Sequence, residues 1–93
     1  ALVFSNTGLL AFGANAASNP QGLVLGGTST ADNFFYPRIT DNGSAATTLY
    51  KNDAGLWILG NSANSYTGPT ILNAGTLGLA TIAALPTNST LQF

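Results

Sequence analysis

The 93-residue chain has no cysteine, no histidine and no methionine, and only five of its residues are charged. Without cysteine there is neither a disulfide framework nor a thiolate zinc site. A charged fraction of 5% lies far below the roughly 25% of an ordinary soluble domain. With a net charge of −1 and no basic patch, the chain lacks the electrostatic footprint of nucleic-acid binding. No apolar run approaches the ~18 residues that a membrane-spanning helix needs.

Helix signals are also scarce, because glycine and proline interrupt the chain every few residues. What recurs instead is a pair of apolar residues two positions apart. These pairs are Leu2 and Phe4, Leu10 and Phe12, Leu23 and Leu25, Trp57 and Leu59, Leu77 and Leu79, and Leu91 and Phe93. Positions i and i+2 of a strand share one face, and turn formers such as Asn42-Gly43 separate the pairs. The pattern predicts a single all-β domain over residues 1–93.

Residues 22–33 and 55–64 resemble each other, and this similarity favours a solenoid. Each segment begins with glycine, continues as a strand that ends in Leu-Gly, and closes with a small polar turn ending in asparagine. Such repeats are typical of the stacked coils of a parallel β-helix. The outward positions are mostly Thr, Ser, Asn and Gly, rather than the charges expected on a sandwich.

One alternative fold stays open. The chain would then be a β-sandwich subunit of a donor-strand polymer, with residues 1–13 completing the sheet of the next subunit. That fold predicts antiparallel strand pairing and a donated strand.

Residues 55–79 resemble the autotransporter-associated β-strand repeat, also called the passenger-associated transport repeat. The hallmark of that family is a strand ending in Leu, then Asn-Thr-Tyr-Thr-Gly-Gly-Thr, then a strand that runs into Asn-Ala-Gly-Thr-Leu-x-Leu. The matching residues here are Leu59, Asn64, Tyr66, Thr67, Gly68, Thr70, Asn73, Ala74, Gly75, Thr76, Leu77 and Leu79. Within the repeat the chain departs from the family at Pro69, where a second Gly is usual, and in the turn at residues 60–64, which is one residue longer. The preceding residues 49–55 resemble the family's lead-in, with Asp53 where Gly is commoner.

The resemblance implies a right-handed parallel β-helix, here of about four coils, in a secreted or surface-anchored bacterial protein. It implies a non-catalytic structural unit with no cofactor and no metal site. We expect the motif to supply core and turn residues of the coils. These residues are Trp57, Leu59, Asn64, Tyr66, Gly68, Thr70, Leu72, Asn73, Gly75, Leu77 and Leu79.

The candidate acid–base groups are few. They are Asp32, Arg38, Asp41, Lys51 and Asp53. Some β-helix enzymes act on polysaccharides, and paired carboxylates about 5–9 Å apart support glycoside hydrolysis. Such enzymes build a long groove from many coils, so we interpret these groups as solvated turn charges, with Lys51 and Asp53 pairing weakly at the surface. Three acids spread along the chain also disfavour a hard-cation site.

The most unusual segment is Phe34-Phe35-Tyr36, because three consecutive side chains of a strand cannot all face inward. At least one ring is therefore expected on the outside, as a candidate contact surface. An adhesin or carbohydrate-binding module would use this face to bind glycans or a host or neighbouring cell.

The two ends of the predicted stack are as apolar as its middle. No polar cap follows the strands at residues 2–4 and 91–93, so we expect both ends to contact adjacent repeats or further copies of the chain. Contacts that repeat without closing would produce an extracellular fibre. Two triplets, Asn42-Gly43-Ser44 and Asn88-Ser89-Thr90, match the N-glycosylation acceptor pattern, although chance matches are the commoner explanation in a bacterial protein.

Overall fold

The computed structural model describes residues 2–8 and 19–92, which contain eight short strands and one turn of 3-10 helix at Ile82–Ala84. The strands are β1 (Val3–Phe4), β2 (Gln21–Leu25), β3 (Asn33–Phe35), β4 (Thr47–Lys51), β5 (Leu56–Leu59), β6 (Thr70–Leu72), β7 (Thr76–Leu79) and β8 (Leu91–Gln92). The expected apolar pair Leu10 and Phe12, most of the 1–13 segment and Phe93 lie outside the described residues.

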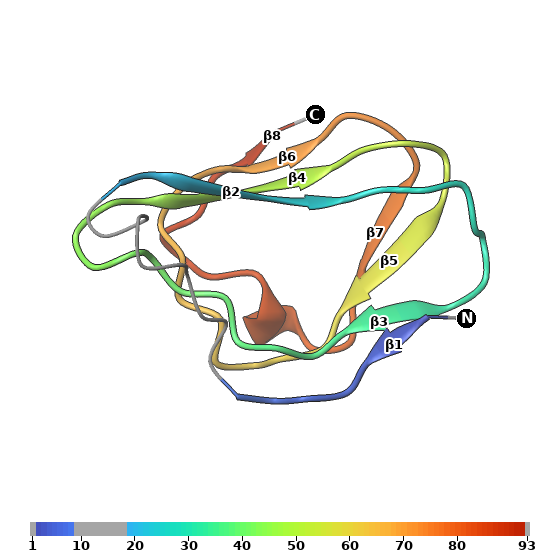
Figure 1. The fold of residues 1–93 in the computed structure, drawn as a ribbon, viewed down its shortest axis with the longest axis horizontal. Helices are drawn as coiled ribbons and strands as arrows, with labels where there is room; N and C mark the ends of the chain where they lie inside the picture. The colour runs from blue at the N-terminus through green and yellow to red at the C-terminus, as the bar shows by residue number, and fades with distance from the viewer. Residues whose placement is uncertain (1, 9–18, 93) are drawn as a thin grey trace.

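The strands form two four-stranded sheets, ordered β1-β3-β5-β7 and β2-β4-β6-β8. Consecutive strands lie in different sheets, so the chain winds through both in turn and makes about three full turns of a solenoid (Figure 1). Every pairing between these strands is parallel. The predicted β-solenoid is confirmed, with about three turns where about four coils were expected. The donor-strand sandwich is wrong for the described residues, whose only antiparallel contact is the bridge between Asn42 and Ala45 in a turn.

The coils differ in length, and this explains the uneven spacing of the apolar pairs in the sequence. Gln21 lies beside Thr47, which is 26 positions further on, whereas Thr70 lies beside Leu91, only 21 positions further on. Strands stack in register while the turns between them absorb the difference. Sequence spacing alone therefore could not set the register of the coils.

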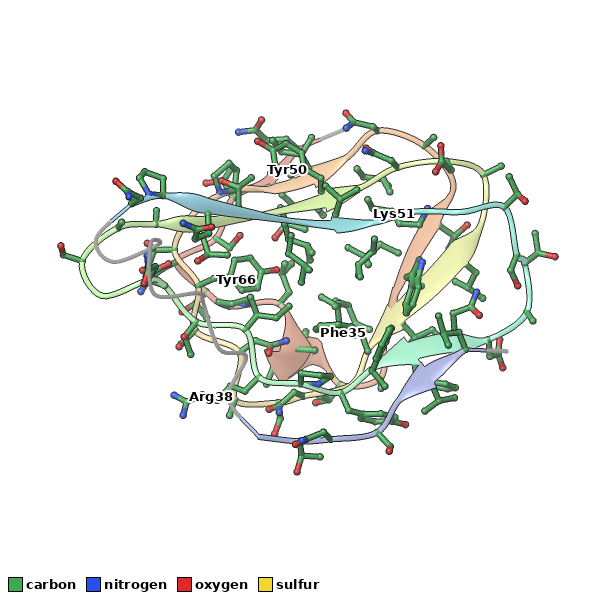
Figure 2. All side chains as sticks on the ribbon, in the orientation of Figure 1. Phe35, Arg38, Tyr50, Lys51 and Tyr66 are labelled. Carbon is green, nitrogen blue, oxygen red and sulfur yellow. The ribbon has the colours of Figure 1, made fainter. Side chains whose placement is uncertain are left out.

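The core lies between the two sheets and is made by inward-facing residues of both sheets and of the segments that connect them. Its buried apolar members are Leu25, Phe35, Ile39, Leu49, Trp57, Leu59, Tyr66 and Ala84. The ring of Phe4 adds to this core, with its centroid 5.6 Å from that of Phe35 and 6.1 Å from that of Trp57. Burial of each large apolar side chain stabilises the fold by about 1.5–3 kcal/mol. Figure 2 shows Phe35, Lys51 and Tyr66 inside the coil, and Arg38 and Tyr50 outside it.

The last coil follows a different path from the others. The 3-10 turn at Ile82–Ala84 lies inside the outline of the preceding coils, across one end of the solenoid (Figure 1). Ala84 is buried by this crossing, whereas Ile82 is 89% exposed. The segment therefore covers only part of the C-terminal end.

Candidate functional site: coil corners and coil ends

Lys51, at the end of β4, is completely buried although it is a cation. Its ammonium donates hydrogen bonds to the backbone carbonyls of Asn52 at 2.6 Å and of Asp53 at 2.9 Å. A third bond, of 3.2 Å, reaches the carbonyl of Ala74 in the next coil. Burial lowers the pKa of Lys51, and the nearby charge of Asp53 opposes that shift. The expected surface pair of Lys51 and Asp53 is therefore wrong, because the strand directs the lysine inward to a ring of carbonyls.

Two residues at this corner adopt a left-handed backbone: Asp53, with φ of 64°, and Gly75, with φ of 72°. The Asp53 carboxylate accepts a hydrogen bond of 2.8 Å from the amide of Gly27, which ties one coil to the preceding one. Asp tolerates this conformation better than most residues, which explains how it replaces the commoner Gly. At Gly75 a Cβ would lie 2.5 Å from the carbonyl oxygen of Gly55, closer still to that of Asp53, and 2.8 Å from the Lys51 ammonium.

Asn33 is buried and links three successive coils through its side-chain amide. Its oxygen accepts a hydrogen bond of 2.8 Å from the backbone of Leu2, in the preceding coil. Its nitrogen donates to the carbonyl of Leu56 in the following coil at 2.9 Å and to that of Ser29 at 3.2 Å. A buried amide with all its partners supplied fixes the relative height of the coils.

Asn64, like Asn33, links neighbouring coils through its side-chain amide, and we call such a side chain a clamp. Its oxygen accepts a hydrogen bond of 2.9 Å from the amide of Ile39 in the preceding coil. Its nitrogen donates to the carbonyl of Ala84 in the following coil, at 3.0 Å. This clamp is what holds the inward-folded 3-10 turn against the solenoid.

Tyr66 is fully buried and begins a chain of hydroxyl groups. Its hydroxyl lies 2.7 Å from Oγ1 of Thr70, which lies 2.8 Å from Oγ of Ser89. Ser89 in turn donates to the carbonyl of Gly68 at 2.7 Å. Burial raises the pKa of Tyr66, and hydrogen bonds from Thr70 and Ser89 oppose the shift. At Gly68 the backbone of Thr47 approaches so closely that no side chain would fit.

Asp41 joins two coils on the outside of the corner that Tyr66 lines. Its Oδ1 accepts hydrogen bonds from the amides of Thr47 at 3.0 Å and Thr67 at 2.8 Å. Its Oδ2 accepts from the hydroxyl of Thr67 at 2.7 Å. Partial burial acts to raise the pKa of Asp41, but these donors outweigh it, and the pKa is lowered. Asp41 is therefore a half-buried turn charge that also links two coils, a role that the sequence interpretation did not include.

The remaining motif residues occupy core and turn positions. Trp57 is 7% exposed and donates its indole N–H to the carbonyl of Gly26 at 2.9 Å, while Leu59 is fully buried. Asn73 lies in the turn after β6. Its side-chain nitrogen donates a hydrogen bond of 2.7 Å to the side-chain oxygen of Asn52 in the preceding coil.

The candidate acid–base groups Asp41, Asp53 and Arg38 each hydrogen-bond to protein groups at separate places. Asp41 and Asp53 have separate partners at different corners, and the Arg38 guanidinium donates to the carbonyl of Ala63 at 3.0 Å. Within residues 2–8 and 19–92, no group of three or more His, Cys, Asp or Glu could hold a metal ion. The same residues include no helix of the length and apolarity needed to cross a membrane.

The three aromatics of the Phe34–Tyr36 segment divide between the two faces of β3 and its extension. Phe35 points inward and is 6% exposed. Phe34 and Tyr36 lie half-buried on the outer face, with ring centroids 5.5 Å apart and planes 8° apart. The Tyr36 ring also covers Gly60 of the next coil, where a Cβ would collide with it. The outer pair is thus the part of this segment that a partner can reach.

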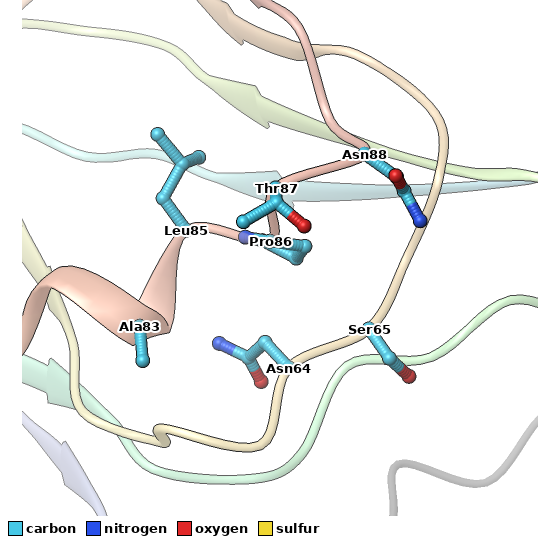
Figure 3. A pocket seen from close by; sticks show the side chains of 7 residues that line it. All are labelled: Asn64, Ser65, Ala83, Leu85, Pro86, Thr87 and Asn88. Carbon is cyan, nitrogen blue, oxygen red and sulfur yellow. The ribbon is translucent and has the colours of Figure 1, made fainter.

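Two hollows lie at the C-terminal end of the solenoid, and no charged residue lines either of them. One, of about 250 Å³, is lined by Leu72, Leu77, Leu79, Leu85 and Leu91. The other, of about 260 Å³, is lined by Asn64, Ser65, Ala83, Leu85, Pro86, Thr87 and Asn88 (Figure 3). β7 and β8 are edge strands, and Leu79 and Leu91 are 39% and 42% exposed. At the other end, residues Leu2, Val3 and Phe4 are about half exposed.

Sequence reasoning missed the clamping roles of Lys51, Asn33 and Asp41. The sequence did hold a signal for Lys51, because Thr47, Leu49 and Lys51 are alternate residues and therefore share one face of the strand. In the structure all three are fully buried. For Asn33 and Asp41 the sequence holds no comparable signal, since the partners that link them to neighbouring coils lie 23 to 31 positions away.

Comparisons with known proteins agree with this architecture. The model of the passenger-associated-transport-repeat family matches residues 49–79, which comprise the predicted repeat at residues 55–79 and the predicted lead-in that begins at residue 49. The chain is 43% identical over 77 residues, or 83% of its length, to the Adhesin BmaC autotransporter of Brucella suis biovar 1 (strain 1330). It spans only 2% of the length of that relative. No solved structure matches the chain significantly. Residues 49–79, which run from β4 to β7 of the solenoid, therefore match the passenger-associated transport repeat, as the resemblance predicted.

Proposed function

We propose that the chain is a non-catalytic structural segment of an autotransporter passenger, and that its coils stack onto neighbouring coils at both ends. The repeat places the chain in a secreted bacterial protein, at the cell surface or outside the cell. One observation carries the proposal. At the C-terminal end, inward-facing leucines line an open hollow beside two strands with an unpaired edge.

The energetics of that end favour a further coil. Leu79 and Leu91 occupy inward positions of β7 and β8, yet each keeps about 40% of its surface exposed. Covering the exposed part would contribute about 1 kcal/mol for each leucine. The same coil would pair the free N–H and C=O groups of both edge strands. The chain matches only 2% of the length of the relative. A passenger of that length would have ample sequence for neighbouring coils.

The experiment compares one substitution in two settings. Leu79→Ser is made in the 93-residue chain and in the longer passenger that contains it, and unfolding in urea is measured in both. We expect Leu79→Ser to cost about 1 kcal/mol more in the longer protein, because only there is the side chain fully buried. Val24→Ser is the matched control, since Val24 is 55% exposed on the outer side of β2 and stacking leaves it exposed. Equal costs of Leu79→Ser in the two settings would contradict the proposal.

Copies of the chain would also associate with one another if their ends are complementary. End-to-end contacts that do not close would give filaments with a rung spacing of about 4.8 Å along the axis. Electron microscopy and sedimentation of the purified chain test this extension. A dispersed monomer at high concentration would exclude fibre formation and leave the stacking of covalently linked coils intact.

Adhesion is a second candidate function, because the relative carries the name adhesin and an aromatic pair lies on the outer face. Phe34 and Tyr36 would contact a glycan or a protein partner on a cell surface. Binding to cells or to glycan arrays should then fall in Phe34→Ala and Tyr36→Ala while the fold is kept. Unchanged binding in both variants would exclude this face as the adhesive surface.

A further inference from the structure

We propose that Asn88 is an acceptor for an N-linked glycan, a modification that goes beyond the stacking role and does not depend on it. Two triplets of the sequence match the acceptor pattern, one beginning at Asn42 and the other at Asn88. Sequence alone gives no reason to prefer either of them. The structure separates them by the state of the amide nitrogen that would receive the sugar.

Asn88 lies in an exposed turn whose backbone is closed by a hydrogen bond of 3.1 Å from the amide of Ser89 to the carbonyl of Pro86. Its side chain points away from Leu85, on the outer side of the turn (Figure 3). Among the described residues its carboxamide has no hydrogen-bond partner. The amide nitrogen is therefore accessible and free to react.

The rest of the triplet is held in place without being covered. Oγ of Ser89 is used internally, in bonds to Thr70 and Gly68. The carbonyl of Thr90 accepts a hydrogen bond of 2.8 Å from the amide of Thr70, which anchors the segment to the preceding coil. Thr90 itself is exposed, so the hydroxyl at the third position of the acceptor pattern can be reached by a transferase.

Asn42 differs in its burial and in the hydrogen bonding of its side chain, although Ser44 at the third position is exposed like Thr90. Asn42 is half-buried, and its amide nitrogen donates a hydrogen bond of 3.0 Å to the carbonyl of Asn19. Its backbone pairs in both directions with Ala45, at 2.9 and 3.0 Å. To receive a sugar there, the protein would first have to break the bond to Asn19 and open the turn. The geometry therefore points to Asn88 alone.

The reaction would use a nucleotide-activated hexose and a separate glycosyltransferase. A bond forms between Nδ2 of Asn88 and C1 of the sugar, while the bond between C1 and the phosphate oxygen breaks. The nucleoside diphosphate leaves with the electron pair, and one amide proton passes to a base of the transferase. The hollow of about 260 Å³ beside Asn88 would receive the first sugar, whose hydroxyls would meet Ser65 and Thr87.

The test has two parts. Protein isolated from its bacterial host is digested and mapped by mass spectrometry with electron-transfer fragmentation, and the folded chain is also incubated with a sequon-specific transferase and UDP-glucose. We expect one hexose or more on the peptide that contains Asn88, lost in Asn88→Gln and Thr90→Ala. The matched variants Asn42→Gln and Ser44→Ala should keep the modification. Trp57 fluorescence verifies that all four variants remain folded.

Two results would overturn the proposal. One is protein from the host with an unmodified Asn88, and the other is a folded chain on which the transferase modifies Asn42 and leaves Asn88 untouched. Neither result bears on stacking, which the Leu79→Ser comparison decides separately.

Discussion

Replacement of Gly75 by alanine tests whether the corner formed with Lys51 holds the coils together. Gly75 has φ of 72° and directly follows Ala74, whose carbonyl accepts a bond from the Lys51 ammonium. A methyl group at position 75 would meet the carbonyl oxygens of Gly55 and Asp53 and the ammonium itself, all within 2.8 Å. Two of these obstacles are backbone atoms of the preceding coil, so a change of rotamer cannot remove them.

The chain contains a matched control at Gly43. That residue has φ of 60°, almost the same conformation, but a Cβ there would find no atom within 4 Å. Gly43→Ala should therefore cost only the left-handed backbone of a non-glycine residue, about 1–2 kcal/mol. Gly75→Ala adds the displacement of packed atoms, about 1–3 kcal/mol more. We expect a total of about 2–5 kcal/mol for Gly75→Ala, a large share of the stability of a small domain.

Urea unfolding followed by Trp57 fluorescence measures both variants. Trp57 is the one tryptophan of the chain, is 7% exposed and lies in the core, so its emission reports loss of the solenoid. The corner argument predicts a clearly lower midpoint for Gly75→Ala than for Gly43→Ala. Equal midpoints would refute it, because the backbone cost is shared and only the close approach to the preceding coil differs.

Four further predictions use the same unfolding assay. Lys51→Met should cost about 2–4 kcal/mol, because it leaves three carbonyls without a donor while filling the same space. The lowered pKa of Asp41 means that its stabilising contribution is present at neutral pH and lost as the pH falls below about 4; Asp41→Asn should abolish this part of the acid dependence. Asn64→Ala should cost about 2–4 kcal/mol, since two backbone groups in neighbouring coils lose their partner. Phe35→Ala should cost about 3–5 kcal/mol and Phe34→Ala clearly less, and similar costs would contradict the assigned faces of the strand.

Strand positions could be predicted from the sequence because each strand carries its own local signal. The alternation in Trp57-x-Leu59 and Leu77-x-Leu79 marks an inward face, and both pairs lie in one ladder of the structure. The order of strands between the two sheets could not be obtained this way. Coil length changes from one rung to the next, so Phe35 and Leu59 are neighbours through the geometry of the turns rather than a fixed period.

The roles of the charged residues could not be predicted, because the sequence does not show which group a charged side chain will contact. Lys51 and Asp53 are two positions apart, and on an exposed strand they would pair at the surface. In the solenoid the chain turns between them, so the ammonium meets carbonyls of the corner while the carboxylate turns back to Gly27. The resemblance did offer one hint, because the family commonly has Gly at the position of Asp53. A Gly there indicates a left-handed backbone, and hence a corner of the coil.

The clamps share a property that explains how such a chain holds its coils with almost no charge. Asn33, Asn64 and Lys51 bind backbone groups of neighbouring coils, and Asp41 binds two backbone amides and one hydroxyl. Bonds to the backbone hardly depend on the side chains of the neighbour, so coils of different sequence can stack on one another. Each clamp that reaches forward needs a following coil, and the last coil of any segment has none. Stability should therefore grow with the number of coils, as nearest-neighbour coupling in solenoids requires.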